Sequence, residues 1–525
     1  MATLSISSFI ICSAIICGLI SIIMYHLRRL RLYKQASQFC GPPLLPFLGN
    51  ALKFVGSTED ILRKAMELLD SYPSPFRVWL GHRLFLCVSN PDQMKTIFLS
   101  QKTIEKEELY KFIRPWLGTG LFTAPASKWR VHRKLIMPTF NQRILESFVE
   151  VFDAQSKVMV QQMEIELDGA EFDVFHYVSL CTLDIICETA MGVSVKAQTE
   201  SNVHYVEAVK RITGGIYRRM FQVWLHPDFI FNRTQLGKSQ KECIKYLHEL
   251  TSEVIRKKKM RLIKSNGIPE SKENGESEPC ISITARRKKA FLDLLMELSH
   301  NGAGFTDIEL REEVDTMIVA GNDTTATINS FVLLMLASHP DVQDKVFQEL
   351  CEIYGNDDTN ERSVRCEDLQ RMEYMERVIK ETMRLFPIAP ILVRAVTDDL
   401  NIGEHTLPKG SSVVIGILKA HRNPEYWPHP LKFDPDRFLP EETAKRHPYC
   451  YLPFSAGPRN CLGGKYAMMA MKALLATVLR SYTLKKDNVV PIENIKLKAD
   501  LMLKPVEPIT VRIERRVAKG CSVPS

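Results

Sequence analysis

The sequence predicts a mainly α-helical protein with a few short strands and one N-terminal membrane helix. Residues 6–25 form a run of 20 residues without a charged side chain, which is long enough to cross a bilayer as a helix. Helical patterns dominate from about residue 91 to 260 and again after residue 306. Short apolar stretches on either side of Gly81 and Gly410 are typical of paired strands.

Composition narrows the class of protein. The 525 residues are 45% hydrophobic and 25% charged, an ordinary globular composition with material for a large core. The net charge of +8 suits a membrane surface or an acidic partner, and the absence of a nucleic-acid motif gives no reason to expect a nucleic-acid partner. Thirteen cysteines without a C-x-x-C pair argue against a disulfide framework or a zinc site.

The N-terminal run predicts an uncleaved anchor, residues 1–26. Arg28, Arg29, Arg31 and Lys34 follow it, so the body should lie on the cytosolic side. A cleaved signal peptide would need basic residues before the run, and "MATLS" has none. Residues 27–50 read as a basic, proline-rich linker, either a stiff spacer or a plain connection, and residues 51–525 as the catalytic domain.

The body is expected to contain these elements in order. Two strands occupy residues 75–91, and a charged, exposed, mobile loop occupies residues 256–289. Thr306 and Glu309 have the spacing of a capping box, which should start a helix that reaches about Ser338. A further helix should end before Pro387, and residues 406–417 read as a β-hairpin.

The long helix carries unfavourable residues at its centre. Gly321, Asp323 and Thr324 are all weak helix formers. One interpretation is a local opening that lets the Thr324 hydroxyl face a cavity, with Asp323 beside it as a proton relay. The other is that the glycine allows close helix packing and that Asp323 forms an ion pair.

Two other pairs of charged or polar residues can form contacts inside a helical protein. Glu381 and Arg384 lie three apart on one helix face, either as a surface pair or as a buried pair that needs a third partner such as Arg437. Trp129 and Arg133 lie four apart and could both donate to one anion, or could belong to a partly buried surface helix.

The segment "FSAGPRNCLG" surrounds Cys461 with turn-forming residues. Gly463 and its neighbouring glycines allow a tight turn with backbone N–H groups near sulfur, and let a flat cofactor approach. Arg459 can meet a carboxylate, and Phe454 can shield the sulfur. The apolar helix that follows would place its N-terminus near a thiolate. A single cysteine that supplies one axial ligand fits haem.

These motifs together resemble one family. F-x-x-G-x-R-x-C-x-G at residues 454–463 is similar to the haem-binding signature of the cytochrome P-450 monooxygenases. W-x-x-x-R from Trp129, the oxygen-activation motif at 320–325, E-x-x-R from Glu381 and P-x-R-F at 435–438 resemble that family's other motifs in order. Within the family, the chain is most similar to the clan of fatty-acid ω-hydroxylases (family four), through the segments "LREEVDTMIVAGNDTT", "LGTGLFTAPASKWR" and "HRNPEYWPHP". It resembles the insect members of that clan.

The resemblance implies the cytochrome P-450 fold, mainly α with a smaller β-rich subdomain, and haem b as cofactor. It implies that Cys461 binds the iron and that Asp323 and Thr324 deliver the protons that oxygen reduction consumes. It further implies that the cofactor is bound by Trp129, Arg133, Arg459, Phe454 and Gly463, with Arg394 as a weaker candidate. A separate structural network that holds the cysteine loop would consist of Glu381, Arg384 and Arg437.

The implied reaction inserts one oxygen atom from O2 into a lipophilic substrate, such as a fatty acid, an insect hormone or a xenobiotic. NADPH would supply electrons through a cytochrome P-450 reductase, with cytochrome b5 as a second candidate partner, on the endoplasmic reticulum membrane. Two alternatives are a haem-thiolate synthase that rearranges a peroxide and a non-catalytic haem protein. The expected substrate pocket is apolar or small throughout: Leu117, Leu121, Met317, Ala320, Ile388, Ile391 and Met502.

The sequence departs from the clan at one informative position. Many clan members have a glutamate directly before the helix glycine, where it can become ester-linked to haem, and this chain has Ala320. No such link can form through this residue, so strict attack at the chain end of a substrate is in doubt. Residues 504–509, "KPVEPI", also lack a glycine that is often present in this substrate-contact segment.

Overall fold

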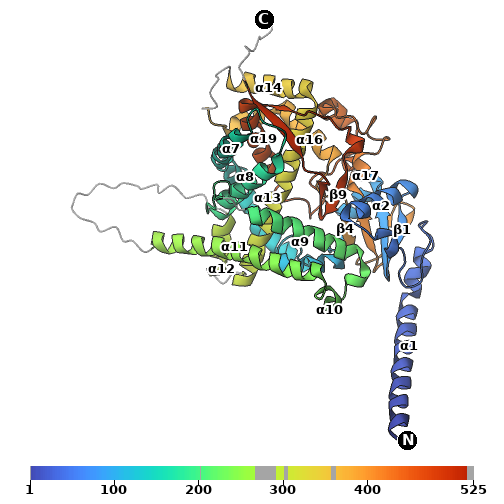
Figure 1. Ribbon diagram of the computed structural model, residues 1–525. Helices are drawn as coiled ribbons and strands as arrows, with labels where there is room; N and C mark the ends of the chain where they lie inside the picture. The colour runs from blue at the N-terminus through green and yellow to red at the C-terminus, as the bar shows by residue number, and fades with distance from the viewer. Residues whose placement is uncertain (1, 201–202, 267–290, 301–304, 356–361, 517–525) are drawn as a thin grey trace.

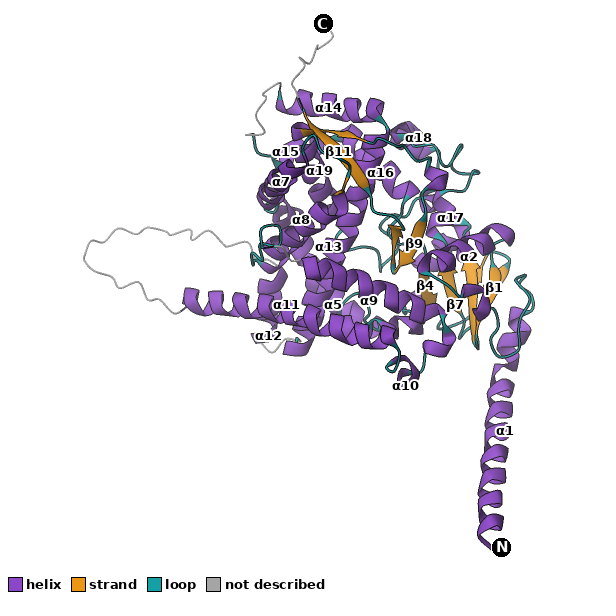
Figure 2. Cartoon of the chain, viewed as in Figure 1, coloured by secondary structure: helices purple, strands orange, loops and turns teal. Residues whose placement is uncertain are grey.

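The computed structural model describes residues 2–200, 203–266, 291–300, 305–355 and 362–516. Helices make up most of this part of the chain (Figure 2). They are α1 (Ala2–Ala36), α2 (Thr58–Ser71), α3 (Pro91–Leu99), α4 (Arg114–Leu117), α5 (Ala126–Ile136), α6 (Gln142–Glu146), α7 (Val149–Met163), α8 (Val174–Ile186), α9 (Val203–Phe221), α10 (Asp228–Phe231), α11 (Gln235–Asn266), α12 (Phe291–His300), α13 (Asp307–Ser338), α14 (Pro340–Tyr354), α15 (Cys366–Arg371), α16 (Glu373–Leu385), α17 (Ile417–His421), α18 (Pro440–Ala444) and α19 (Gly464–Ser481).

The strands form small sheets beside the helices. They are β1 (Phe76–Leu80), β2 (Arg83–Val88), β3 (Phe172–Asp173), β4 (Leu392–Ala395), β5 (Leu400–Ile402), β6 (His405–Leu407), β7 (Ser412–Ile415), β8 (Tyr482–Lys485), β9 (Leu497–Asp500), β10 (Met502–Pro505) and β11 (Thr510–Arg515). The largest sheet has the order β1-β2-β7-β4, another has the order β3-β11-β8, and β9–β10 and β5–β6 are two-stranded. The prediction of a mainly helical protein with a smaller β-rich part is confirmed.

Helix α13 crosses the middle of the helical part (Figure 1). It begins with the predicted capping box, because Thr306 accepts from the Glu309 N–H and the Glu309 side chain accepts from the Thr306 N–H. It packs against α8, α16 and α19, and residues on all of its faces are buried from Leu310 to Ala337. A helix that is covered on every side belongs to a core, so α13 is the element around which the other helices are arranged.

Two predicted elements differ in the structure. Residues 406–417 do not form a hairpin, because β6 pairs with β5 while β7 pairs in parallel with β2 and antiparallel with β4. Local apolar patterning cannot reveal such non-local partners. The predicted helix before Pro387 is divided at Met372 into α15 and α16. The two strands at residues 75–91 are β1 and β2, as predicted. The predicted mobile loop, residues 256–289, lies mostly outside the described residues, and its described part, residues 256–266, is wrong as a loop because it continues helix α11.

The N-terminal helix is longer than the anchor that the sequence suggests. It continues to Ala36, and its last turns pack on the largest sheet through a Tyr33–Trp79 ring stack at 4.7 Å between centroids. Arg31 forms an ion pair with Asp399 at 2.8 Å. Beyond it, the Arg77 N–H donates to the Cys40 carbonyl at 2.8 Å and the Asn50 N–H to the Trp79 carbonyl at 2.6 Å. Residues 27–50 are therefore joined to the body at several points.

Among the described residues, one segment is both long and apolar enough to cross a membrane: Val174–Met191, in α8 and the turn after it. It is 78% buried inside the protein, which identifies it as a core helix. The apolar part of α1 that meets the same composition test is shorter, Ser8–Gly18.

Candidate functional site: a cysteine loop beside the central helix

The loop before α19 holds Cys461 in a tight turn. The Cys461 N–H donates to the Phe454 carbonyl at 2.9 Å, which closes the loop. Gly457 has φ +70°, and a Cβ there would lie 2.1 Å from the Phe98 carbonyl oxygen, so only glycine fits. At Gly463 a Cβ would meet no atom within 4 Å. That open backbone is the surface that a flat cofactor could approach.

The surroundings of Cys461 change the pKa of its thiol in opposite directions. Burial raises the pKa of Cys461, while a hydrogen bond from the Gly463 N–H and the charge of Arg133 lower it. Arg133 also donates to the Asn460 carbonyl at 3.0 Å and to Asn460 Oδ1 at 2.8 Å. The observed contacts of Arg133 are therefore with the cysteine loop, whereas the sequence predicted that it points with Trp129 towards one anion. Its positive charge favours a thiolate over a thiol.

Glu381, Arg384 and Arg437 come together, as the sequence suggested. Both residues of the first pair are fully buried, and two Arg384 nitrogens donate to the Glu381 carboxylate at 2.7 and 2.8 Å. Arg437 Nε lies 3.4 Å from Glu381 Oε1. The carboxylate thus meets two guanidinium groups and also accepts the Asp434 N–H at 3.0 Å, so its buried charge is well compensated.

His421 connects this network to the cysteine loop. Arg384 donates to the His421 carbonyl at 3.0 Å, and the Leu452 N–H donates to His421 Nε2 at 2.7 Å. Burial lowers the pKa of His421 to about 3, and the Arg384 charge acts in the same direction. The neutral ring can therefore accept at Nε2 at any ordinary pH. The sequence did not single out His421, because its partners lie about 30 residues or more away along the chain.

The centre of α13 shows the close helix packing of the second interpretation, and the expected local opening of the helix is wrong. A Cβ at Gly321 would lie 2.5 Å from the Ile186 side chain, so the glycine lets α8 approach. The helix is continuous there, and the Thr324 hydroxyl donates to the Ala320 carbonyl at 2.6 Å. Ala320 is exposed although Val319 and Asn322 beside it are buried. Protein side chains therefore leave this patch of a core helix uncovered.

Asp323 forms the buried ion pair that belongs to the same second interpretation. Lys504 Nζ, from β10, lies 2.8 Å from Asp323 Oδ1, and both side chains are less than a tenth exposed. Asp323 Oδ2 has no hydrogen-bond partner among the described residues. The carboxylate is thus anchored at one oxygen and free at the other.

Cationic side chains gather beside the cysteine loop: Arg394 is buried, and Arg459 and Lys106 are half-buried. Arg459 lies over the Trp129 ring at 4.9 Å and donates to the Ala124 carbonyl, yet its Nε and NH1 have no partner among the described residues. Burial lowers its pKa to about 10, followed by the charge of Arg394. Burial also holds the pKa of Lys106 well below its usual value, and Arg394 and Arg459 act in the same direction.

An anionic ligand would fit the donors of this cation cluster. Glu105 is the carboxylate whose charge raises the pKa of Arg459. Glu105 already accepts hydrogen bonds from the backbone N–H groups of Lys106 and Ala126. Unmet donors in a buried site cost free energy unless a ligand satisfies them. A group with carboxylates of its own would do so. Lys106 was missed by sequence reasoning, because its isolated pairing with Arg394 is non-local.

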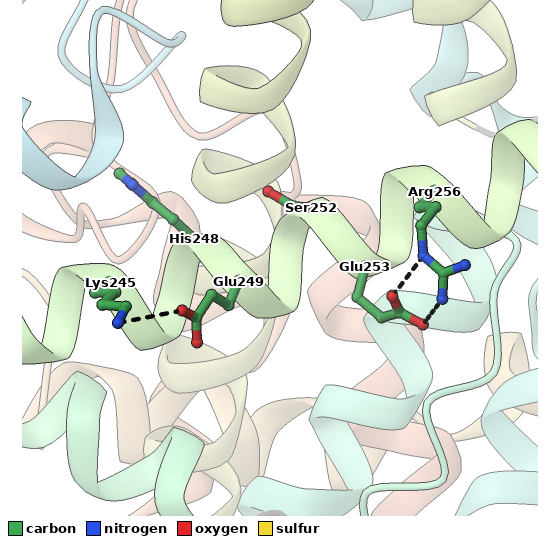
Figure 3. Close-up of a pocket in the computed structure, with 6 residues that line it drawn as sticks. All are labelled: Lys245, His248, Glu249, Ser252, Glu253 and Arg256. Carbon is green, nitrogen blue, oxygen red and sulfur yellow. Dashed lines mark hydrogen bonds and ion pairs between the residues drawn. The ribbon is translucent and has the colours of Figure 1, made fainter.

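The predicted pocket residues fall into two groups in the structure. Leu117 and Leu121 belong to the α4–α5 segment, which contacts α13, the helix of Met317 and Ala320. Ile388, Ile391 and Met502 are half-buried on neighbouring chain segments, since the Leu503 N–H donates to the Ile388 carbonyl at 2.8 Å. A shallow depression elsewhere, on α11, is polar and contains none of these residues (Figure 3).

Comparisons with known proteins identify the class. The family model for Cytochrome P450 matches residues 40–512, so the chain belongs to the cytochrome P450 family and is a monooxygenase. It is 38% identical to Cytochrome P450 4c3 of Drosophila melanogaster over 95% of this chain and 93% of the relative. It is 37% identical to Cytochrome P450 4V2 of Mus musculus, over 90% and 88%. It is also 36% identical to Cytochrome P450 4c21 of Blattella germanica, over 95% and 97%.

Membership implies a haem held by a cysteine thiolate, and the residues present fit that group. Cys461 is a single thiol in a turn with a backbone donor and a nearby cation. Arg459 offers unmet donors, and haem b carries two propionates that could accept them. The exposed patch at Ala320 and the open backbone at Gly463 leave room for a flat ring.

Proposed function

We propose that this monooxygenase inserts one oxygen atom from O2 into a C–H bond or double bond of a lipophilic substrate, with electrons from NADPH delivered by a flavoprotein reductase. The observation that carries the proposal is the combination of the Cys461 turn with the donors of Arg459 that have no partner in the described part of the chain. Bound haem would supply the reductive activation of O2. The residues of the chain would bind it, exclude water and deliver protons.

The residues around Cys461 have proposed roles in holding the cofactor. Cys461 would hold the haem iron through its thiolate, and the Gly463 N–H and Arg133 would stabilise its negative charge. Arg459, Arg394 and Lys106 would meet the propionates. Trp129 would hold Arg459 in place by its ring contact. Phe454 would cover one side of the sulfur, with its ring against Gly464, which has no side chain to displace it.

Proton delivery is proposed for Thr324 and Asp323. The Thr324 hydroxyl is bonded to the Ala320 carbonyl at the uncovered patch of α13, where it can donate or accept when a water arrives. Asp323 has one oxygen fixed by Lys504 and one that has no partner within the described residues. A carboxylate that is held but not saturated can pass a proton to a neighbouring hydroxyl through water.

The proposed substrate is a lipophilic molecule, because both groups of predicted pocket residues consist of apolar or small side chains. Ala320 would leave more room than a glutamate and would form no covalent link to the cofactor. We therefore propose a bulkier or less regioselective range of substrates than strict chain-end hydroxylation allows.

A membrane location is proposed from three features. These are the apolar run in α1, the packing of its last turns on the β-sheet, and exposed apolar side chains such as Phe47 and Phe229, which are 81% and 66% exposed. Figure 1 shows α1 extending from the side of the body that carries β1. We propose a single-pass anchor in the endoplasmic reticulum with the body in the cytosol.

The test is an assay with a series of saturated fatty acids in lipid vesicles that contain the protein and reductase. The readout is the position of hydroxylation. Products spread over several positions are expected if Ala320 widens the site. Dominant terminal hydroxylation would contradict the role of Ala320. No turnover of any chain length would exclude this substrate class, and hormones and insecticides would be assayed next.

A further inference from the structure

The segment between α4 and α5, residues 118–124, is tied to α13 by a buried carboxylate. Glu313 is fully buried, and its Oε2 accepts the Leu121 N–H at 3.0 Å. Its Oε1 lies 2.6 Å from His132 Nδ1, on α5. When Glu313 is ionised its carboxylate can only accept, and the contact then takes a hydrogen from His132 Nδ1. Glu313 thus joins the central helix, the segment and the start of α5 at one point.

Neighbouring contacts leave the segment little freedom. Thr119 donates to Glu312 Oε2 at 3.0 Å, and Lys128 donates to Thr119 at 2.8 Å. A Cβ at Gly120 would lie 2.6 Å from the Glu312 carbonyl oxygen, so the backbone of the segment lies directly on α13. The segment is therefore packed against the helix turn that precedes Ala320.

The other end of the segment reaches the cation cluster. Arg459 donates to the Ala124 carbonyl, and Phe122 packs its ring near Lys106 at 4.6 Å and Tyr110 at 5.7 Å. Residues 118–124 thus run from α13 to the residues that are proposed to hold the cofactor. A shift at Leu121 would move the side chains of the segment relative to both.

We propose that Glu313, together with His132, is a positioning residue that determines specificity, because it fixes where Leu121 and Phe122 stand relative to Thr324. The expected effect on how the substrate is held rests on the proposed function. The fixation of residues 118–124 on α13 is a property of the fold alone. Without the carboxylate, the buried Leu121 N–H and His132 Nδ1 lose their acceptor, and residues 118–124 keep only the Thr119–Glu312 contact and the backbone packing of Gly120 on α13. Substrates would then be held less uniformly.

A conservative variant separates positioning from charge. In Glu313→Gln the amide oxygen can still accept the Leu121 N–H, and the amide nitrogen can donate to Nδ1 of the other His132 tautomer. Glu313→Ala removes both contacts. Asp153 on α7 provides the matched control: it is 5% exposed, accepts the Val364 N–H at 3.0 Å and pairs with Lys157 at 2.9 Å.

The experiment uses the haem-loaded full-length protein and its Glu313→Ala, Glu313→Gln and Asp153→Ala variants. Hydrogen–deuterium exchange of peptides that cover residues 118–124 reports fixation, with no need for turnover. Optical titration with 1-phenylimidazole, and with imidazole as a small reference, reports the space over the iron. Product positions from dodecanoic acid report specificity wherever the wild type turns over this acid.

We expect Glu313→Ala to speed exchange of the segment at least tenfold and to change phenylimidazole affinity severalfold, with imidazole affinity unchanged. Glu313→Gln should restore both, and Asp153→Ala should change neither. Exchange of residues 118–124 that stays at the wild-type rate in Glu313→Ala would overturn the proposal, as would an equal effect in Asp153→Ala. Faster exchange with unchanged phenylimidazole affinity would overturn the role in specificity. A wild type that oxygenates nothing would overturn the proposed function, while exchange and azole binding would still decide the positioning role.

Discussion

Thr324 donates its hydroxyl hydrogen to the Ala320 carbonyl at 2.6 Å, on the uncovered patch of α13. We predict that Thr324→Ala lowers the product formed per NADPH severalfold and raises the release of hydrogen peroxide, because proton delivery is interrupted. Both are measured in the reconstituted system. Thr327→Ala is the matched control, since Thr327 makes the same type of bond to the Asp323 carbonyl at 2.7 Å on the buried side. Unchanged coupling in Thr324→Ala would remove Thr324 from the relay.

The Asp323–Lys504 pair should affect stability and chemistry separately. Removing one partner of a buried pair typically costs roughly 3–5 kcal/mol, because the other charge is left unpaired. We predict that Lys504→Met lowers the free energy of unfolding and that Asp323→Asn/Lys504→Met recovers most of it. The double variant should nevertheless keep the poor coupling of Asp323→Asn. Denaturant unfolding and product per NADPH measure the two effects, and full recovery of coupling in the double variant would contradict the relay.

The contact between α11 and α13 contains a carboxyl that titrates near neutrality. Thr251 has one hydroxyl hydrogen but lies 3.0 Å from the Leu247 carbonyl and 2.5 Å from Asp315 Oδ1. The Thr251 hydroxyl donates to Asp315 Oδ1, which lowers the pKa of Asp315, but burial has the larger effect. Burial raises the pKa of Asp315 from 3.8 to about 7. Its neighbours His248 and Arg311 lie 3.6 and 3.7 Å from Oδ2, and burial lowers the pKa of His248.

The sign of the pH effect follows from that shift. A carboxyl that holds its proton more tightly when folded contributes stability below pH 3.8, and this contribution is lost as the pH rises through about 7. We predict that the unfolding temperature of the wild type falls by several degrees between about pH 4 and pH 7, and that Asp315→Asn flattens this slope. Thermal unfolding at several pH values measures it. An equal slope in both proteins would show that Asp315 does not titrate in this range.

Local signals in the sequence were sufficient for several elements but not for their partners. The capping box at Thr306, the strands around Gly81 and the turn around Cys461 depend on residues close in the chain, and they were predicted. Residues 406–417 were wrongly paired, because β7 finds its partner in β2 more than 300 residues away. The contacts of Glu313, His421 and Lys504 were missed for the same reason.

The molecule as a whole brings five sequence motifs to one region through long-range contacts. The E-x-x-R pair reaches the cysteine loop through His421, and the W-x-x-x-R helix reaches it through Arg133 and Asn460. The sequence could order these motifs along the chain, but their joining depends on the packing of α5, α16 and α19 around α13. The cation cluster beside Cys461 emerges only from that packing.

The central claim is that this arrangement performs reductase-dependent insertion of oxygen from O2. The most direct measurement is the reaction of the lipid-reconstituted protein with NADPH, reductase and isotopically labelled O2, with mass spectrometry of the product. We predict one labelled oxygen atom per product molecule, strict dependence on reductase, and no product from Cys461→Ser. Product without the label, or product formed without reductase, would contradict the account.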